Sequence, residues 1–165
     1  MHAKGIIGKY AVGGASAVAF YAEPIATKDL DIFFLFEPPQ DGLILSMEPI
    51  YDYCRENGYS YDHEFISIGG WDVQFVESSH DPLWMDALAN AQTFTFDGSS
   101  INVLPPEQLA TMWASVARPK DILKILHFAT YDVLDSAKLN ELLVRFDLIE
   151  TWRKIQAGLP DEFRY

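Results

Sequence analysis

The strongest hydrophobic signal lies in residues 29–36, where two aspartates precede an unbroken apolar run over residues 32–36. A run without polar breaks is typical of a strand buried on both faces of a sheet. Residues 42–57 carry apolar side chains at helical spacing and end at an Asn-Gly pair, which predicts a helix. Residues 14–22 are rich in alanine and predict a short apolar helix.

Two glycine-containing turns predict β-hairpins in the middle of the chain. Gly69-Gly70 separates two strand-like segments, and Asp97-Gly98 is the strongest hairpin signal in the sequence. The predicted strands are residues 63–68 and 72–77 in the first hairpin, and residues 92–96 and 100–104 in the second. A short helix is expected between the hairpins, over residues 83–90.

The pattern becomes helical after Pro105-Pro106 and stays helical. The expected helices are residues 106–117, 119–131, 135–146 and 147–157. A mixed sheet followed by a helical C-terminal third indicates an α/β or α+β fold. Because the 165 residues contain no linker, repeat or low-complexity tract, residues 1–165 are expected to form a single domain.

Composition narrows the class of protein. The 49% of hydrophobic residues exclude global disorder, and a single cysteine, Cys54, excludes an internal disulfide and a four-cysteine zinc site. The net charge of −12 repels nucleic acids and anionic membranes at long range. The uncharged stretch from Tyr10 to Ala22 has 13 residues, too few to span a bilayer. A secretion signal ending near Glu23 is an alternative, but a paired glycine is unfavourable in a helical signal core, and we expect a cytoplasmic protein.

The first candidate for chemistry is the pair Asp29 and Asp31. Two residues apart on a strand, their side chains point to the same face, where two carboxylates repel each other unless a cation lies between them. Oxygen-rich sites of this kind suit Mg²⁺ or Mn²⁺. The alternative is a strand whose polar end simply reaches solvent.

Three further groups of residues are weak indicators of a functional site when each is considered alone. The Gly13-Gly14 pair and Ser16 precede a predicted helix, where free backbone N–H groups attract phosphate, although an ordinary strand-to-helix turn explains them too. Asp72 begins a predicted strand and is either a third metal-binding acid or a turn residue. Arg118 and Lys120 lie at a predicted helix start, either to hold phosphate or as solvated charges.

The order of these groups resembles the nucleotidyltransferase superfamily: a Gly-Gly before a helix, then Thr27-Lys28-Asp29-Leu30-Asp31 on a strand, then a later acid. The segment from Val103 to Leu109, followed by Arg118-Pro119-Lys120-Asp121, resembles the AbiEii type, the abortive-infection toxin kind found in toxin–antitoxin systems. The resemblance covers about residues 8–130.

The resemblance implies a minimal nucleotidyltransferase fold and the transfer of a nucleoside monophosphate from a nucleoside triphosphate to an acceptor. It assigns Mg²⁺ or Mn²⁺ to Asp29 and Asp31, with Asp72 as the third metal-binding and catalytic acid. It assigns nucleotide binding to Gly13, Gly14, Ser16, Thr27, Lys28, Arg118 and Lys120. The acceptor is left open among an RNA end, a protein side chain and a small molecule, and a protein partner is compatible with a toxin-like role.

Two departures from the resemblance keep a second interpretation open. Such sequences often carry an arginine shortly before the first aspartate and a lysine five residues before the later arginine. The corresponding segments here hold Ile25 with Ala26, and Trp113. The loss of two cations favours the alternative of a catalytically degenerate protein that binds nucleotide or a protein partner.

Overall fold

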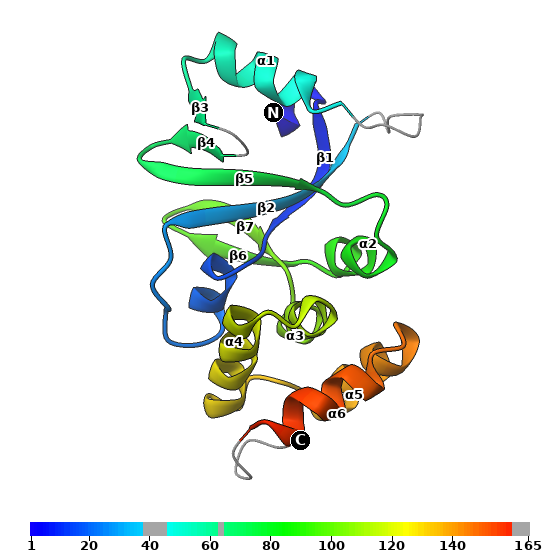
Figure 1. Ribbon diagram of the computed structural model, residues 1–165. Coiled ribbons are helices and arrows are strands. Elements are labelled where there is room, and N and C mark those ends of the chain that lie inside the picture. The colour runs from blue at the N-terminus through cyan, green and yellow to red at the C-terminus, as the bar shows by residue number, and fades with distance from the viewer. Residues whose placement is uncertain (38–45, 63–64, 160–165) are drawn as a thin grey trace.

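The computed structural model describes residues 1–37, 46–62 and 65–159, and these residues form a seven-stranded mixed sheet with helices on both sides (Figure 1). The strand order is β3-β4-β5-β2-β1-β7-β6. The strands are β1 (Ile7–Val12), β2 (Asp29–Phe36), β3 (Ser60–Asp62), β4 (Phe65–Ile68), β5 (Trp71–Glu77), β6 (Gln92–Phe96) and β7 (Ser99–Val103). The α-helices are α1 (Glu48–Glu56), α2 (Pro82–Ala89), α3 (Pro106–Val116), α4 (Pro119–Thr130), α5 (Ser136–Arg145) and α6 (Ile149–Ala157), and the 3₁₀ helices are η1 (His2–Lys4) and η2 (Ser16–Phe20).

Strand β2 lies in the middle of the sheet, antiparallel to β1 and parallel to β5. Its side chains alternate between two apolar clusters: Phe34 and Phe36 pack with Ile50 and Cys54 on the α1 side, and Phe33 packs in the cluster on the side of α2 and α3. The unbroken apolar run is therefore explained as predicted, because both faces of this strand are covered.

Both predicted hairpins are present. Gly69 and Gly70 join β4 to β5 with φ of +59° and +86°, and Asp97 and Gly98 join β6 to β7 with φ of +47° and +75°. Two consecutive positive φ angles match the right-handed twist of paired strands, which is why these residue pairs signal hairpins. The start of the first predicted strand, residues 63–64, lies outside the described residues.

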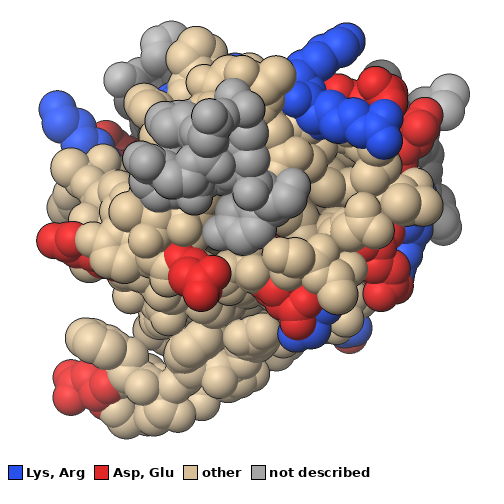
Figure 2. Space-filling model, turned by 90° about the horizontal axis from the view of Figure 1, so that it is seen from below, with Lys and Arg blue, Asp and Glu red and all other residues tan. Residues whose placement is uncertain are grey.

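The helical C-terminal third is present with helix boundaries within two residues of those predicted. Pro106 and Pro119 occupy the first turns of α3 and α4, where a missing N–H costs nothing. Helix α3 is central to this region: nine of its eleven residues are buried, and α2, α4, α5 and α6 surround it. Figure 2 views the molecule from this side and shows acidic and basic residues scattered over the surface, with no large patch of one sign.

Two local predictions need correction, and two strands were not predicted. The expected helix over residues 14–22 is a five-residue 3₁₀ helix, η2, because Gly14 adopts a left-handed conformation and the chain turns before Ser16. The helix predicted over residues 42–57 begins at Glu48, and residues 42–45 lie outside the described part of the chain. Strands β1 and β3 were not expected from the hydrophobic pattern.

Candidate functional site

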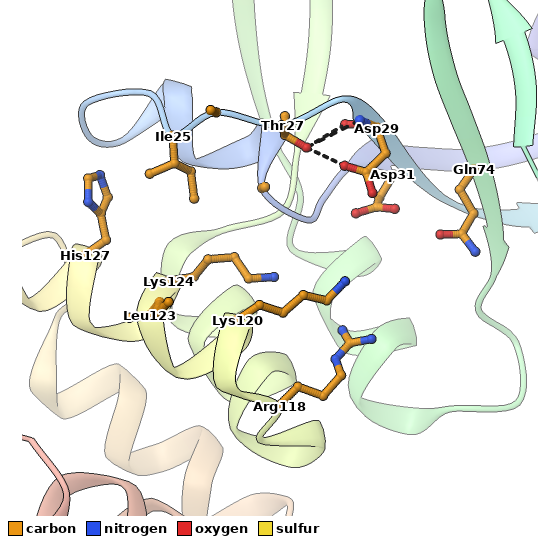
Figure 3. Close-up of a pocket in the computed structure, with 12 residues that line it drawn as sticks. Ile25, Thr27, Asp29, Asp31, Gln74, Arg118, Lys120, Leu123, Lys124 and His127 are labelled. Carbon is orange, nitrogen blue, oxygen red and sulfur yellow. Dashed lines mark hydrogen bonds between the residues drawn. The ribbon is translucent and has the colours of Figure 1, made fainter.

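A cavity of about 440 Å³ opens between the start of β2 and one side of α4 (Figure 3). Its strand wall holds Asp29, Asp31 and, from β5, Gln74. The segment before β2 contributes one rim, and α4 with the residue preceding it forms the opposite wall. In addition to the strand residues, the lining consists of Ala15, Ile25, Ala26, Thr27, Arg118, Lys120, Leu123, Lys124 and His127.

The strand wall gathers oxygen atoms. The parallel register of β2 and β5 pairs Asp31 with Gln74, and both side chains line the cavity together with Asp29. Burial and the neighbouring charge of Asp29 raise the pKa of Asp31 above its ordinary value, against the lowering effect of Lys124, Lys120 and Arg118. The carboxylate at position 31 is thus held in a place where its negative charge is incompletely compensated.

Gly14 lies against Asp31 and allows this arrangement. A Cβ atom at Gly14 would lie 1.8 Å from Asp31 Oδ2, and the φ of +58° is itself unfavourable for other residues. Gly13 is equally confined, since its added Cβ would lie 2.4 Å from a ring carbon of Phe33. The backbone N–H of Gly13 donates to the Asp31 carbonyl oxygen at 2.9 Å. The contacts of the paired glycines are therefore made with β2.

Two hydroxyl groups hold the start of β2. Thr27 Oγ1 donates to the carboxylate of Asp29, and Ser16 Oγ donates to the Asp29 carbonyl oxygen at 2.9 Å. These bonds tie the segment before β2 and the start of η2 to the same residue. The position of Asp29 is set by this local network, as Figure 3 shows for the Thr27 contact.

The helix wall is built around a buried aspartate. Asp121 is fully buried, and its carboxylate lies 2.6 Å from Arg118 Nε and 2.7 Å from Lys124 Nζ. Burial acts to raise the pKa of Asp121, but the hydrogen bonds and charges of the two cations outweigh it and hold the pKa below its ordinary value. Arg118, Lys120 and Lys124 extend from this wall toward the carboxylates of β2 (Figure 3).

The far end of the cavity is less polar. Ile25 and Leu123 lie there with His127, away from the carboxylates (Figure 3). His127 Nε2 lies 2.8 Å from the Glu23 carbonyl oxygen, which can only accept a hydrogen bond, so this nitrogen carries the proton. The cavity thus has one charged end and one end suited to a planar or apolar group.

The structure brings five of the predicted site residues to this cavity: Thr27, Asp29, Asp31, Arg118 and Lys120. Gly14 lines a smaller adjoining cavity of about 100 Å³, and Ser16 lines an apolar groove elsewhere. Gly13 and Lys28 do not line the main cavity.

The predicted third acid, Asp72, is exposed on β5 and pairs in register with Asp29, and it does not line the cavity; its role stays a prediction. In residues 1–37, 46–62 and 65–159, no three His, Cys, Asp or Glu side chains form a group able to hold a metal ion. On β5, Asp72 is the register partner of Asp29 and Gln74 is the register partner of Asp31.

Gln74 and Lys124 line the cavity but were not assigned to the site from the sequence. Gln74 shares its strand face with Asp72, so strand parity places it on the same side, but a neutral amide by itself does not indicate a metal or phosphate site. Lys124 lies three residues after Asp121, a spacing that places both on one side of a helix. Neither residue belongs to a motif that sequence alone singles out.

Comparison with known proteins supports the fold. No protein-family model and no curated protein matches the chain. A solved structure described as an antigenic nucleotidyltransferase-like protein from Paracoccidioides brasiliensis matches with a TM-score of 0.51 and 14% identity, over 88% of this chain and 83% of that one. Among the described residues, every helix is too short or too polar to cross a bilayer. The mixed sheet, its flanking helices and this similarity show that the chain has an α/β, nucleotidyltransferase-like fold.

Proposed function

We propose that the protein is a metal-dependent nucleotidyltransferase that moves a nucleoside monophosphate from a nucleoside triphosphate to an acceptor. The observation that carries the proposal is the cavity itself, in which two carboxylates on β2 face three cations on the α4 side. A triphosphate with a divalent cation has the complementary charge distribution: its oxygens match the cations, and its metal ion matches the carboxylates.

The donor set on β2 and β5 fits Mg²⁺ or Mn²⁺. Asp29 and Asp31 supply carboxylate oxygens, and Gln74 supplies an amide oxygen at the neighbouring register position. These hard oxygen ligands are the ones that Mg²⁺ prefers, and no sulfur or imidazole ligand is needed. When bound, the ion neutralises phosphate charge. Asp29, Asp31 and Gln74 are the members of the proposed set that line the cavity, and Asp72, in register with Asp29 on β5, stays in the proposal as the third acid.

The chain's own residues then act mainly by positioning and electrostatics. Arg118 and Lys120 contact the phosphates, while Ile25 and Leu123 bound the end where the base is placed. The acceptor oxygen forms a bond to the α-phosphorus, the bond from this phosphorus to the bridging oxygen breaks, and pyrophosphate leaves. The acceptor's proton passes to water, and Arg118 stabilises the charge that develops on the leaving group.

The acceptor belongs to the proposal only as a class: an RNA end, a protein side chain or a small molecule. A net charge of −12 disfavours a long nucleic acid. The scattered charges in Figure 2 provide no continuous basic track on that face. The AbiEii-like toxin role, the cytoplasmic location and a protein partner are proposed from the resemblance and the composition described above.

A labelled nucleotide tests this proposal. Each nucleoside triphosphate, carrying ³²P at the α-phosphate, is incubated with the protein, Mg²⁺ or Mn²⁺ and a cell extract as the source of acceptors. We expect metal-dependent transfer of label that is lost in Asp31→Asn and kept in Asp52→Asn, a matched change on α1. Absence of transfer with all four nucleotides would contradict the proposal.

A catalytically inactive nucleotide-binding module is the second candidate function. One observation favours it: Ile25 and Trp113 stand in the segments where the resemblance leads us to expect positively charged residues. This candidate predicts metal-dependent binding of nucleoside triphosphates without label transfer. Transfer by the wild-type protein that is lost in Asp31→Asn excludes it.

A further inference from the structure

Lys124 is the most enclosed cation of the cavity. Its side chain is 11% exposed, against 55% for Arg118, and Lys120 is also exposed. Its ammonium group lies 2.7 Å from the carboxylate of Asp121 and 4.9 Å from the centre of the Trp113 ring. A carboxylate on one side and an aromatic face on another confine the group to one position.

The confined ammonium group of Lys124 still has an N–H group that can donate a hydrogen bond into the cavity. An ammonium carries three N–H groups; in the described part of the chain the ammonium of Lys124 contacts Asp121 and the Trp113 ring, and its charge also acts on Asp31. Lys124 lines the cavity together with Asp31, and Figure 3 shows it extending toward the carboxylate side. One donor is therefore available to an oxygen atom placed between the two walls.

Burial explains why this cation differs from its neighbours. Lys120 is an exposed side chain that loses conformational freedom when it binds a ligand, and Arg118, although it pairs with Asp121, is more than half exposed to solvent. Lys124 has already lost that freedom in the folded protein, because Asp121 and Trp113 fix it. A phosphate oxygen at this position meets a donor that needs no reorganisation.

We propose that Lys124 is a third phosphate-binding residue of the cavity, held in place by Asp121 as a positioning residue and by the ring of Trp113. The proposal deepens the function proposed above and rests on it, since it names a contact for the polyphosphate chain. The same geometry gives Trp113 a role: the position where the resemblance expects a lysine supplies instead the surface on which Lys124 rests.

Binding of inorganic tripolyphosphate and of ATP with Mg²⁺, measured by calorimetry, tests the proposal. A charge-assisted hydrogen bond to phosphate predicts a loss of affinity of roughly 10- to 100-fold in Lys124→Gln for both ligands. Lys124→Arg keeps the charge and retains most of the affinity. Asp121→Asn, which never touches the ligand, lowers affinity because Lys124 is no longer fixed. Lys154→Gln, an exposed lysine on α6, leaves binding unchanged.

The outcomes separate this inference from the proposed function. Loss of tripolyphosphate binding in Lys124→Gln, in a wild-type protein that transfers no label, supports the inference while the transferase function fails. Unchanged binding of both ligands in Lys124→Gln overturns the inference even if label transfer is observed, and so does a wild-type protein that binds neither ligand. If circular dichroism shows that Lys124→Gln is unfolded, Lys124→Met keeps the stem packed on Trp113 and answers the same question.

Discussion

Asp31 and Asp121 belong to opposite walls of one cavity, and their surroundings differ in the number of cations that contact them. Asp121 has Arg118 and Lys124 within 2.7 Å, and its pKa lies below the ordinary value despite complete burial. Asp31 lies beside another carboxylate, and its pKa is raised by burial and by Asp29. The same residue type therefore forms close ion pairs on the helix wall, whereas on the strand wall its charge is disfavoured by burial and by a neighbouring carboxylate.

This difference in charge environment distinguishes a structural aspartate from one that binds a ligand. A buried carboxylate with two cations fixes the side chains around it, and its removal destabilises the fold because a buried positive charge is left without a partner. A carboxylate whose charge is only partly matched costs stability in the free protein and is retained where a ligand supplies the missing positive charge. We therefore interpret Asp121 as part of the scaffold and Asp31 as part of the binding site.

The largest expected effect is on the helix wall. Asp121→Ala leaves Lys124 buried without its counter-charge, and we expect a loss of about 3 kcal/mol in the free energy of unfolding, at the lower end of the range for broken buried pairs because Arg118 reaches solvent. Urea unfolding monitored by circular dichroism measures it. Asp52→Ala, which removes the partner of an exposed ion pair, is expected to change stability by less than about 1 kcal/mol. Equal effects of the two substitutions would contradict the scaffold role of Asp121.

A smaller effect is expected where the strand wall touches its glycine. Gly14→Ala combines left-handed strain of about 1–2 kcal/mol with a clash against Asp31. Gly58→Ala is a matched control, because its φ is +73° and no atom lies within 4 Å of the added Cβ. We expect Gly14→Ala to lower the unfolding free energy more than Gly58→Ala and to weaken metal-dependent nucleotide binding, which Gly58→Ala leaves intact. Equal destabilisation would show that Asp31 moves freely.

The two aspartates predict opposite dependences of stability on pH. The lowered pKa of Asp121 contributes stability that is present above the unfolded value, about 3.9, and is lost as the pH falls below it. The raised pKa of Asp31 makes the folded state bind its proton more tightly, so stability from this group declines as the pH rises above the unfolded value.

Thermal unfolding of the ligand-free protein between pH 3 and pH 8 distinguishes them. Asp31→Asn is expected to raise the midpoint slightly at neutral pH, whereas Asp121→Asn is expected to lower it and to weaken its dependence on pH below about 4. A lower midpoint for Asp31→Asn at neutral pH would place Asp31 in the scaffold and remove the contrast.

Much of the fold follows from local signals in the sequence. The apolar run in β2, the glycines of the hairpins and the prolines at the starts of α3 and α4 each act through the conformation of a few neighbouring residues. Strand β1 was missed because Gly8 and Lys9 interrupt its apolar pattern, and η2 was predicted as a longer helix because its composition is helical. The turn at Gly14 depends on the close approach of Asp31, a contact between distant segments.

The candidate site was only partly accessible to the same reasoning. Asp29 and Asp31 share a face because of strand parity, which sequence shows directly. Parity also groups Asp72 with Gln74, but the register of β5 against β2 decides that Gln74 lies beside Asp31. Lys124 lies in the site because its ammonium group pairs with the buried Asp121 and rests on the ring of Trp113 from α3. These contacts arise from the packing of α4 on α3, which the sequence does not show.

The most direct test of the central claim is the shift in thermal midpoint caused by each nucleoside triphosphate, with and without Mg²⁺ or Mn²⁺. A ligand at 100 times its dissociation constant stabilises the folded state by about 2.7 kcal/mol, which corresponds to roughly 5–10 °C for a chain of this size. We expect a metal-dependent shift that disappears in Asp31→Asn and persists in Asp52→Asn. No shift with any nucleotide at millimolar concentration, or an equal shift in Asp31→Asn, would contradict it.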